Sequence, residues 1–96
     1  MQHKFLVHEP GDSVGVAVAD IKAGEKVTGV FLNDHQARVE VVAQQDIPLG
    51  HKIALVPVAR GDRVIKYGVA IGVAERAIAP GEHVHVHNLK SARWGR

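Results

Sequence analysis

Asp20-Ile21-Lys22-Ala23-Gly24-Glu25-Lys26-Val27 sets a pattern that recurs at residues 46–53, 58–64 and 78–84. Each copy has an apolar anchor three positions before a glycine, then two polar residues, then a branched apolar residue. This order predicts a buried anchor, a tight turn in which glycine takes a positive φ, and re-entry into a strand. We call each copy a glycine corner. Because the spacing between copies is uneven, the pattern predicts a compact, folded-over β domain and not a solenoid.

The composition agrees with one small β-rich domain. The chain has 96 residues, valine is abundant, and aromatic residues make up only 4%. The absence of cysteine excludes a disulfide framework and a thiolate metal site. The net charge of +2 comes from interleaved acids and bases, which gives no nucleic-acid footprint. No signal peptide and no apolar run near the ~20 residues that span a bilayer are present. We therefore expect a cytoplasmic protein with neither nucleic-acid nor membrane partners.

Short apolar runs predict the strands. They lie at residues 5–7, 13–19, 27–32, 37–42, 53–56, 64–65 and 69–77. The strands at 27–32 and 37–42 predict a hairpin around a polar four-residue loop, residues 33–36. Gly72 interrupts the last run and indicates a bulge or a close backbone approach. Helix is expected at most as single turns, within residues 17–22 and 55–60.

The stretch Gly81-Glu82-His83-Val84-His85-Val86-His87-Asn88 is the first candidate for chemistry. In an extended strand its three histidines share one face, with neighbouring imidazoles about 6–7 Å apart at their bases. Such a pair can turn toward one divalent first-row metal. The alternative is a solvent-facing edge strand, and His83, directly after the turn, is the histidine most expected to be merely exposed. Asn88 could orient a ligand histidine, bind a carboxylate, or simply end the strand.

Three further places carry weaker signals. His51 stands where the other glycine corners have an acid, which indicates a special role or a plain surface turn. Lys66 and Tyr67 lie between an apolar strand and Gly68. A partly buried lysine there could be a base or an anion clamp, although such lysines more often extend to water. Residues 90–96 form a basic tail with one tryptophan, which suits docking on a protein partner better than contacting RNA.

Taken in order, four segments resemble the SAF domain of the altronate dehydratase family. They are residues 46–55, residues 64–68, Ile71-Gly72 and residues 81–88, and residues 11–17 also fit. The resemblance implies a mostly β fold, a small β-clip (SAF-type) domain of short strands and many turns with little helix. It places that domain at residues 1–89 and the tail at 90–96. The ending, with Arg93-Trp94, is similar to the small subunit of the sulfolactate sulfo-lyases in this family.

The resemblance also implies a function. We expect the small subunit of a two-subunit lyase that β-eliminates water or sulfite from a 2-hydroxy (sugar) acid, inactive without its large catalytic subunit. A divalent metal, with iron the expected ion, would be held mainly by the large subunit. His85 and His87 are the expected metal contacts. His51, Lys66 and Asn88 are the expected catalytic residues, and Lys66, Tyr67 and Asn88 the expected substrate-binding residues.

Two other functions stay open at this stage. A stand-alone SAF module would bind an anionic sugar or sugar acid without catalysis, and the isolated chain could form a homo-oligomer. RNA binding through the basic tail is the least favoured and would show a steep salt dependence. The identity of the hydroxy acid is not fixed by this chain, because the large subunit would contribute to substrate selection.

Overall fold

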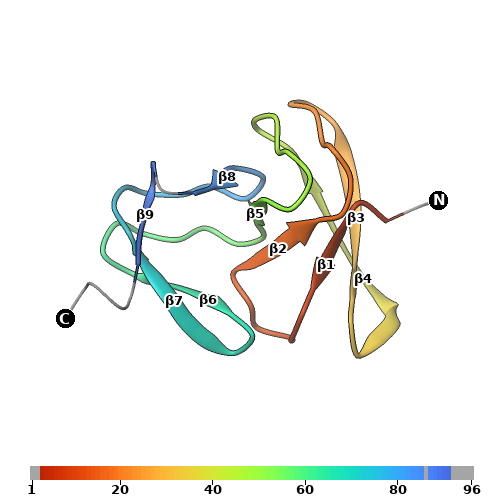
Figure 1. Ribbon diagram of the computed structural model, residues 1–96, viewed down its shortest axis with the longest axis horizontal. Helices are drawn as coiled ribbons and strands as arrows, with labels where there is room; N and C mark the ends of the chain where they lie inside the picture. The colour runs from red at the N-terminus through yellow and green to blue at the C-terminus, as the bar shows by residue number, and fades with distance from the viewer. Residues whose placement is uncertain (1–2, 86, 92–96) are drawn as a thin grey trace.

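The computed structural model describes residues 3–85 and 87–91, and within them it contains strands and turns but no helix (Figure 1). The strands are β1 (Phe5–Val7), β2 (Val14–Ala17), β3 (Lys26–Phe31), β4 (Asp34–Val42), β5 (Lys52–Ala54), β6 (Arg63–Lys66), β7 (Val69–Ala74), β8 (His83–Val84) and β9 (Leu89–Ser91). One sheet has the order β4-β3-β1-β2-β5-β8, and a second has the order β6-β7-β9. The prediction of a small, mostly β, β-clip domain with little helix is confirmed.

The four glycine corners form as the sequence predicts. The corner glycines Gly24, Gly50, Gly61 and Gly81 have φ values of +88°, +86°, +89° and +90°. In each corner the residue after the glycine donates its N–H to the carbonyl three residues earlier, as in a type II turn. The anchors also meet in pairs, because Ile21 pairs with Ile47 and Val58 pairs with Ile78 in isolated antiparallel bridges.

Each glycine corner docks on the backbone of a buried alanine that belongs to its paired corner. Gly24 donates its N–H to the Ala43 carbonyl, and Ala43 donates to the carbonyl of Glu25. The same exchange joins Gly50–His51 to Ala17, Gly61–Asp62 to Ala74, and Gly81–Glu82 to Ala54. Backbone hydrogen bonds therefore join the first corner to the second and the third corner to the fourth. Because these connections are backbone hydrogen bonds, they do not depend on the polar side chains of the corners.

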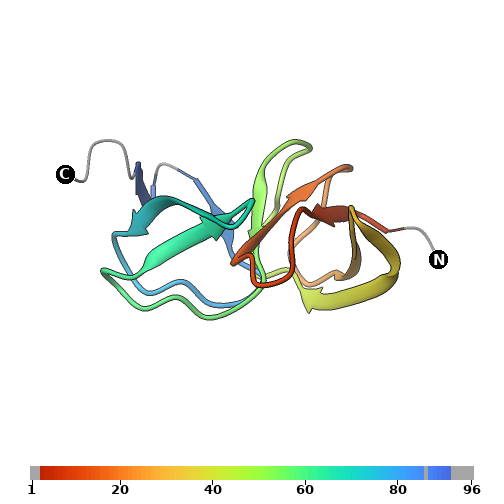
Figure 2. The ribbon, with the colours of Figure 1, turned by 90° about the horizontal axis from the view of Figure 1, so that it is seen from below.

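Each pair of joined corners packs around one small hydrophobic core. The first contains both alanines, both anchors and both re-entry residues of corners one and two: Ala17, Ala43, Ile21, Ile47, Val27 and Ile53, with Phe5 and Val7. The second repeats the set for corners three and four: Ala54, Ala74, Val58, Ile78, Val64 and Val84, with Val14. Strands β2 and β5 contribute to both cores and so form the seam between two halves that lie side by side (Figure 2).

Several local predictions were wrong in extent. The four-residue hairpin loop is a two-residue turn at Leu32 and Asn33, and residues 34–36 belong to β4. The pairing there jumps from Phe31↔Asp34 to Val30↔Arg38, so an irregularity in β4 accommodates the polar residues that the pattern assigned to the loop. Strand β7 ends at Ala74 and not at residue 77, because residues 75–77 lead into the fourth corner.

The prediction for Gly72 is confirmed. The pairing of β6 with β7 shifts between Val64 and Ile65, opposite Gly72. A Cβ on Gly72 would lie 2.4 Å from the carbonyl oxygen of Lys90, so β9 packs too closely for any side chain. Strand β9 extends into the predicted tail as far as Ser91, and residues 92–96, with Arg93 and Trp94, lie outside the described part of the chain.

Candidate functional site

Three histidines converge at the seam between the two halves. His51 follows the second corner glycine and precedes β5, while His83 begins β8, which pairs antiparallel with β5. The Nδ1 atom of His51 lies 2.8 Å from Nε2 of His83. The His85 ring is centred 4.7 Å from that of His51 and 5.5 Å from that of His83. One nitrogen from each of the three rings falls within 4.8 Å of the others.

The side chain of His51 is free for this cluster because of Pro48. In the first corner the carboxylate of Glu25 accepts the N–H of Lys22, three residues earlier, at 3.1 Å. In the fourth corner, Glu82 accepts the N–H of Ala79 in the same way. Proline has no N–H to satisfy. The second corner therefore does not need an acid after its glycine, which gives a physical reason for the departure of His51 from the acidic pattern.

Asn88 holds the loop that carries His83 and His85. Its side chain is 1% exposed. Its Oδ1 accepts the backbone N–H of His85 at 3.0 Å, and its Nδ2 donates to the carbonyl of His83 at 2.8 Å. Both polar atoms of the amide are thus used on backbone of the cluster, an arrangement that fits the orienting role among those considered for Asn88. Direct contact of Asn88 with a substrate stays a prediction.

The extended histidine strand was predicted too long. Strand β8 ends at Val84, His85 lies in a bend, and residues 87 and 88 form a turn that His85 and Asn88 close by a backbone hydrogen bond. Val86 lies outside the described residues. The rings nevertheless gather, because a turn pinned by Asn88 brings His85 and His87 back toward His83.

His83 is the central histidine of the cluster and not the merely exposed one. It is half-buried, whereas His85 and His87 are exposed. Burial lowers the pKa of His83 from its usual value, and the charges of His51, His87, His85 and Lys52 lower it further. A neutral imidazole is the form that binds a metal ion. His85 belongs to the group of three; His87 contacts His83 at a ring separation of 5.3 Å but lies outside that group. Its assignment as a metal ligand stays a prediction.

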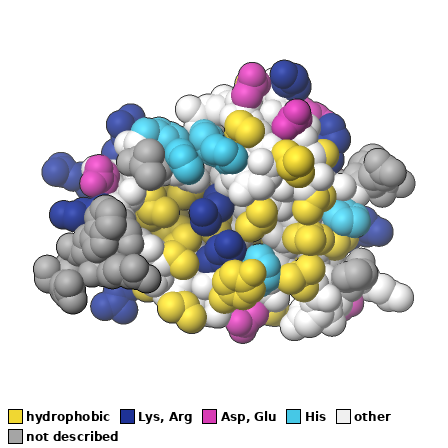
Figure 3. All heavy atoms as spheres, in the orientation of Figure 1, with side chains coloured by type: hydrophobic (Ala, Val, Ile, Leu, Met, Phe, Trp, Pro, Cys, Tyr) yellow, Lys and Arg dark blue, Asp and Glu magenta, His cyan; other side chains and the backbone are white. Residues whose placement is uncertain are grey.

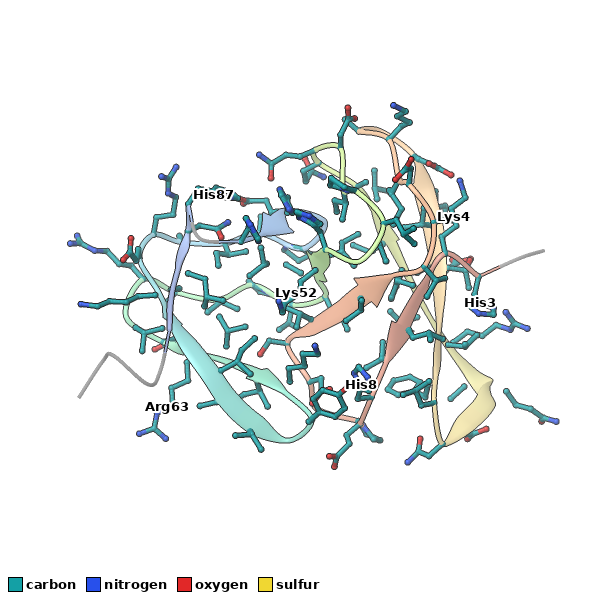
Figure 4. All side chains as sticks on the ribbon, in the orientation of Figure 1. His3, Lys4, His8, Lys52, Arg63 and His87 are labelled. Atoms are coloured by element: carbon teal, nitrogen blue, oxygen red, sulfur yellow. The ribbon has the colours of Figure 1, made fainter. Side chains whose placement is uncertain are left out.

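A second group of side chains lies on the same face. Figure 3 shows the histidine cluster next to basic side chains near the middle of this face, with a further histidine beyond them. In Figure 4, Lys52 lies between His87 and His8. The positive charge of Lys52 lowers the pKa of both His83 and Lys66. Lys66 holds its Nζ 5.0 Å from the centre of the Tyr67 ring.

Lys52 and His8 were missed by the sequence analysis as candidate site residues. Lys52 is the residue after His51, and only His51 was singled out in that segment, because it departs from the acidic pattern of the other corners. His8 precedes a Pro-Gly turn and gave no signal of its own. The approach of His8 to Lys66 depends on the contact between the β1–β2 and β6–β7 turns, which are far apart in sequence. The signal available for Lys52 was its position in the Gly50-His51-Lys52 motif.

Comparison with known proteins decides the family. The model of the altronate/galactarate dehydratase SAF domain matches residues 3–92. The chain belongs to this family. The SAF domain is 42% identical over 95 residues to (2R)-sulfolactate sulfo-lyase subunit alpha of Chromohalobacter salexigens, which covers 98% of this chain and 100% of the relative. It is 48% identical over 54 residues to the subunit of the same name from Paracoccus pantotrophus, with 56% of this chain and 81% of the relative covered.

The SAF domain also matches part of much longer enzymes. It is 41% identical over 87 residues to altronate dehydratase of Bacillus subtilis, which covers 91% of this chain but 16% of the relative. The same unit therefore occurs as a whole subunit in one set of relatives and as a small part of a single chain in another. Within the described residues no helix is long and apolar enough to cross a membrane.

Proposed function

We propose that this SAF domain is the small subunit of a two-subunit cytoplasmic lyase, which β-eliminates water or sulfite from a 2-hydroxy acid together with a large catalytic subunit. The observation that carries the proposal is the open histidine cluster. His51, His83 and His85 converge at the surface, and the group includes no carboxylate. The full-length similarity to a lyase subunit alpha supports the same conclusion and gives no support to a stand-alone binding module.

The cluster fits a divalent metal ion. Cis ligands about 2.0–2.1 Å from a metal are separated by about 3 Å. The 2.8 Å between Nδ1 of His51 and Nε2 of His83 is close to that separation. Imidazole ligands suit iron, zinc and related ions. We propose that this face supplies imidazole ligands, that the large subunit supplies most of the remaining ligands, and that the ion is iron, as the family resemblance implies.

The residues of this chain would divide the work in the following way. A bound metal would act as a Lewis acid on the substrate carboxylate and make the adjacent proton more acidic. Without a metal, the same two nitrogens of His51 and His83 share a hydrogen bond, so one of them carries a proton that would have to leave before both could bind the ion. Lys66 would bind an anionic group of the substrate. Asn88 would keep His83 and His85 in place through their backbone.

The activity test uses the chain together with its large subunit. The tagged SAF domain should capture the protein encoded next to it, and the pair should release sulfite from sulfolactate or water from a sugar acid. His85→Ala should reduce this activity by at least 10-fold, since one metal or proton-transfer group accounts for about that much or more. His3→Ala is the matched control, because His3 is exposed and lies outside the cluster. A chain that captures no lyase subunit, and whose ligand affinity survives His85→Ala, would refute the proposal.

Metal binding can be measured on the chain alone. Co²⁺ added to the SAF domain should give a visible absorption band that is lost in His83→Ala and retained in His3→Ala. An unchanged spectrum in His83→Ala would exclude the cluster as a metal site.

A further inference from the structure

A second polar site lies beside the histidine cluster, built on two turns that are locked together. The carboxylate of Asp12, which is 4% exposed, accepts the backbone N–H groups of Tyr67 and Gly68, both at 3.0 Å. Next to it, Ser13 accepts the N–H of Ile65 at its Oγ and donates its own N–H to the Ile65 carbonyl at 2.8 Å. The β1–β2 turn and the β6–β7 turn therefore form one rigid platform.

Tyr67 is held on this platform in an uncommon conformation. Its φ is +59°, and it is the residue other than glycine with a positive φ in the described part of the chain. A bulky residue in this region is strained, and such strain persists where the surrounding structure enforces it, commonly at binding sites. The result is that the Tyr67 ring packs on His8, with ring centres 3.6 Å apart, and lies under the Lys66 ammonium.

The two lysines beside this platform form no ion pair within the described residues. The ion pairs of the described residues are Lys4–Glu25 and Lys26–Glu40, so neither Lys52 nor Lys66 has an acidic partner within them. Asp12 is the acid that faces Lys66, and both of its oxygens already accept backbone N–H groups. The Nδ1 atom of His8 is buried and has no hydrogen-bond partner. Lys66 and His8 thus lie against the same Tyr67 ring, with Lys52 nearby, and one imidazole nitrogen of His8 has no hydrogen-bond partner.

We propose that Lys52, Lys66 and His8 form a binding site for a small oxyanion, a carboxylate or a sulfonate, next to the histidine cluster. Charge-assisted hydrogen bonds from two ammonium groups would compensate their mutual repulsion, and an imidazole N–H would complete the set. This inference rests on the proposed function. It adds that the substrate carries two anionic groups, one for the metal at the histidine cluster and one for this platform.

Burial and the nearby charge of Lys52 both lower the pKa of Lys66. Burial and Lys66 together lower the pKa of His8, and they outweigh the opposing charges of Asp12 and Glu9. A bound anion would stabilise the charged forms of both side chains, which agrees with the geometry.

The test is an NMR titration of the ¹⁵N-labelled chain with malate, a 2-hydroxy acid with two carboxylates, and with lactate, which has one. Malate should shift the amide signals of Tyr67 and Gly68, which lie on the platform, and should saturate. Lys52→Met and Lys66→Met should each weaken malate binding by roughly 10-fold, about the effect of one charge-assisted hydrogen bond. Lys22→Met is the matched control, because it makes the same charge change at an exposed corner and should leave malate affinity unchanged.

His8→Phe keeps a ring against Tyr67 but removes the buried nitrogen, and it should also weaken malate binding. Equal affinities for malate and lactate, shifts confined to the histidine cluster, or lysine variants that bind like Lys22→Met would overturn the proposal. The titration does not depend on the large subunit. A pair that is active while the lysine variants bind malate normally would refute this inference alone. Malate binding at the platform by a chain that captures no large lyase subunit would refute the proposed function alone.

Discussion

Replacing Gly81 by alanine should break the contact between the fourth glycine corner and the other half of the molecule. Gly81 has a φ of +90°, and a Cβ there would lie 2.0 Å from the carbonyl oxygen of Val42. Its own carbonyl accepts the N–H of Gln44 at 2.8 Å. Because these partners are backbone atoms of the first half, they can move aside only if the two halves separate.

Gly61 provides a matched control for this substitution. It occupies the same position in the third corner with a φ of +89°, but a Cβ there meets nothing within 4 Å. Gly61→Ala should therefore cost only the backbone strain, about 1–2 kcal/mol of unfolding free energy. Gly81→Ala should cost the same strain plus about 1–3 kcal/mol for the clash.

Urea denaturation of both variants measures the difference. With a slope of about 1 kcal/mol per molar urea for a chain of this size, the Gly81→Ala midpoint should lie about 1–3 M below that of Gly61→Ala. Equal midpoints would refute the packing of the corner on Val42. A Gly61→Ala variant as stable as the wild type would refute the argument from positive φ.

Three further predictions concern the site and the core. Asn88→Ala should lower the unfolding free energy by about 2–3 kcal/mol, since it removes two part-buried hydrogen bonds to the backbone of His83 and His85. It should also weaken Co²⁺ binding, and normal Co²⁺ affinity would count against an orienting role. Burial and the neighbouring Lys66 lower the pKa of His8 in the folded chain. Near and below about pH 6.5 the unfolded chain therefore binds more protons than the folded chain, and the unfolding free energy decreases as the pH is lowered. His8→Phe should reduce that loss between pH 7.5 and 5.5 in urea denaturation, and an unchanged loss would contradict the assignment. Phe5→Ala should cost about 3–5 kcal/mol, because Phe5 is fully buried in the first core, and a cost below about 1 kcal/mol would contradict this packing.

The fold could be predicted from the sequence because the signals that decide it are local. The anchor, glycine and re-entry residue of a corner lie within eight residues, and positive φ at the glycine follows from that order alone. The partners of the corners were not predictable in the same way. The corners are met by the backbone groups of four alanines, whose side chains give no sign of these hydrogen bonds: Ala17, Ala43, Ala54 and Ala74.

The sequence predicted which residues form the candidate site better than it predicted how they are arranged. His51 and His85 were singled out by local pattern, and the structure brings them together across the seam. The role of His83 was misjudged because its burial depends on β5, which lies about 30 positions earlier in the chain. The end of β8 at Val84 was missed because Asn88 competes with strand pairing by bonding to the backbone, a preference that alternation of valine and histidine does not reveal.

The release of His51 by Pro48 has a consequence for how this scaffold tolerates change. The second corner is closed by backbone groups, and Pro48 leaves no N–H to cap. The side chain of residue 51 is therefore not needed for folding. Position 51 should accept many amino acids without loss of folding, whereas positions 25 and 82 are tied to acids that cap their own turns. Adjacent residues thus have separate roles: Gly50 is needed for the turn, whereas residue 51 can vary with the chemistry of the histidine cluster.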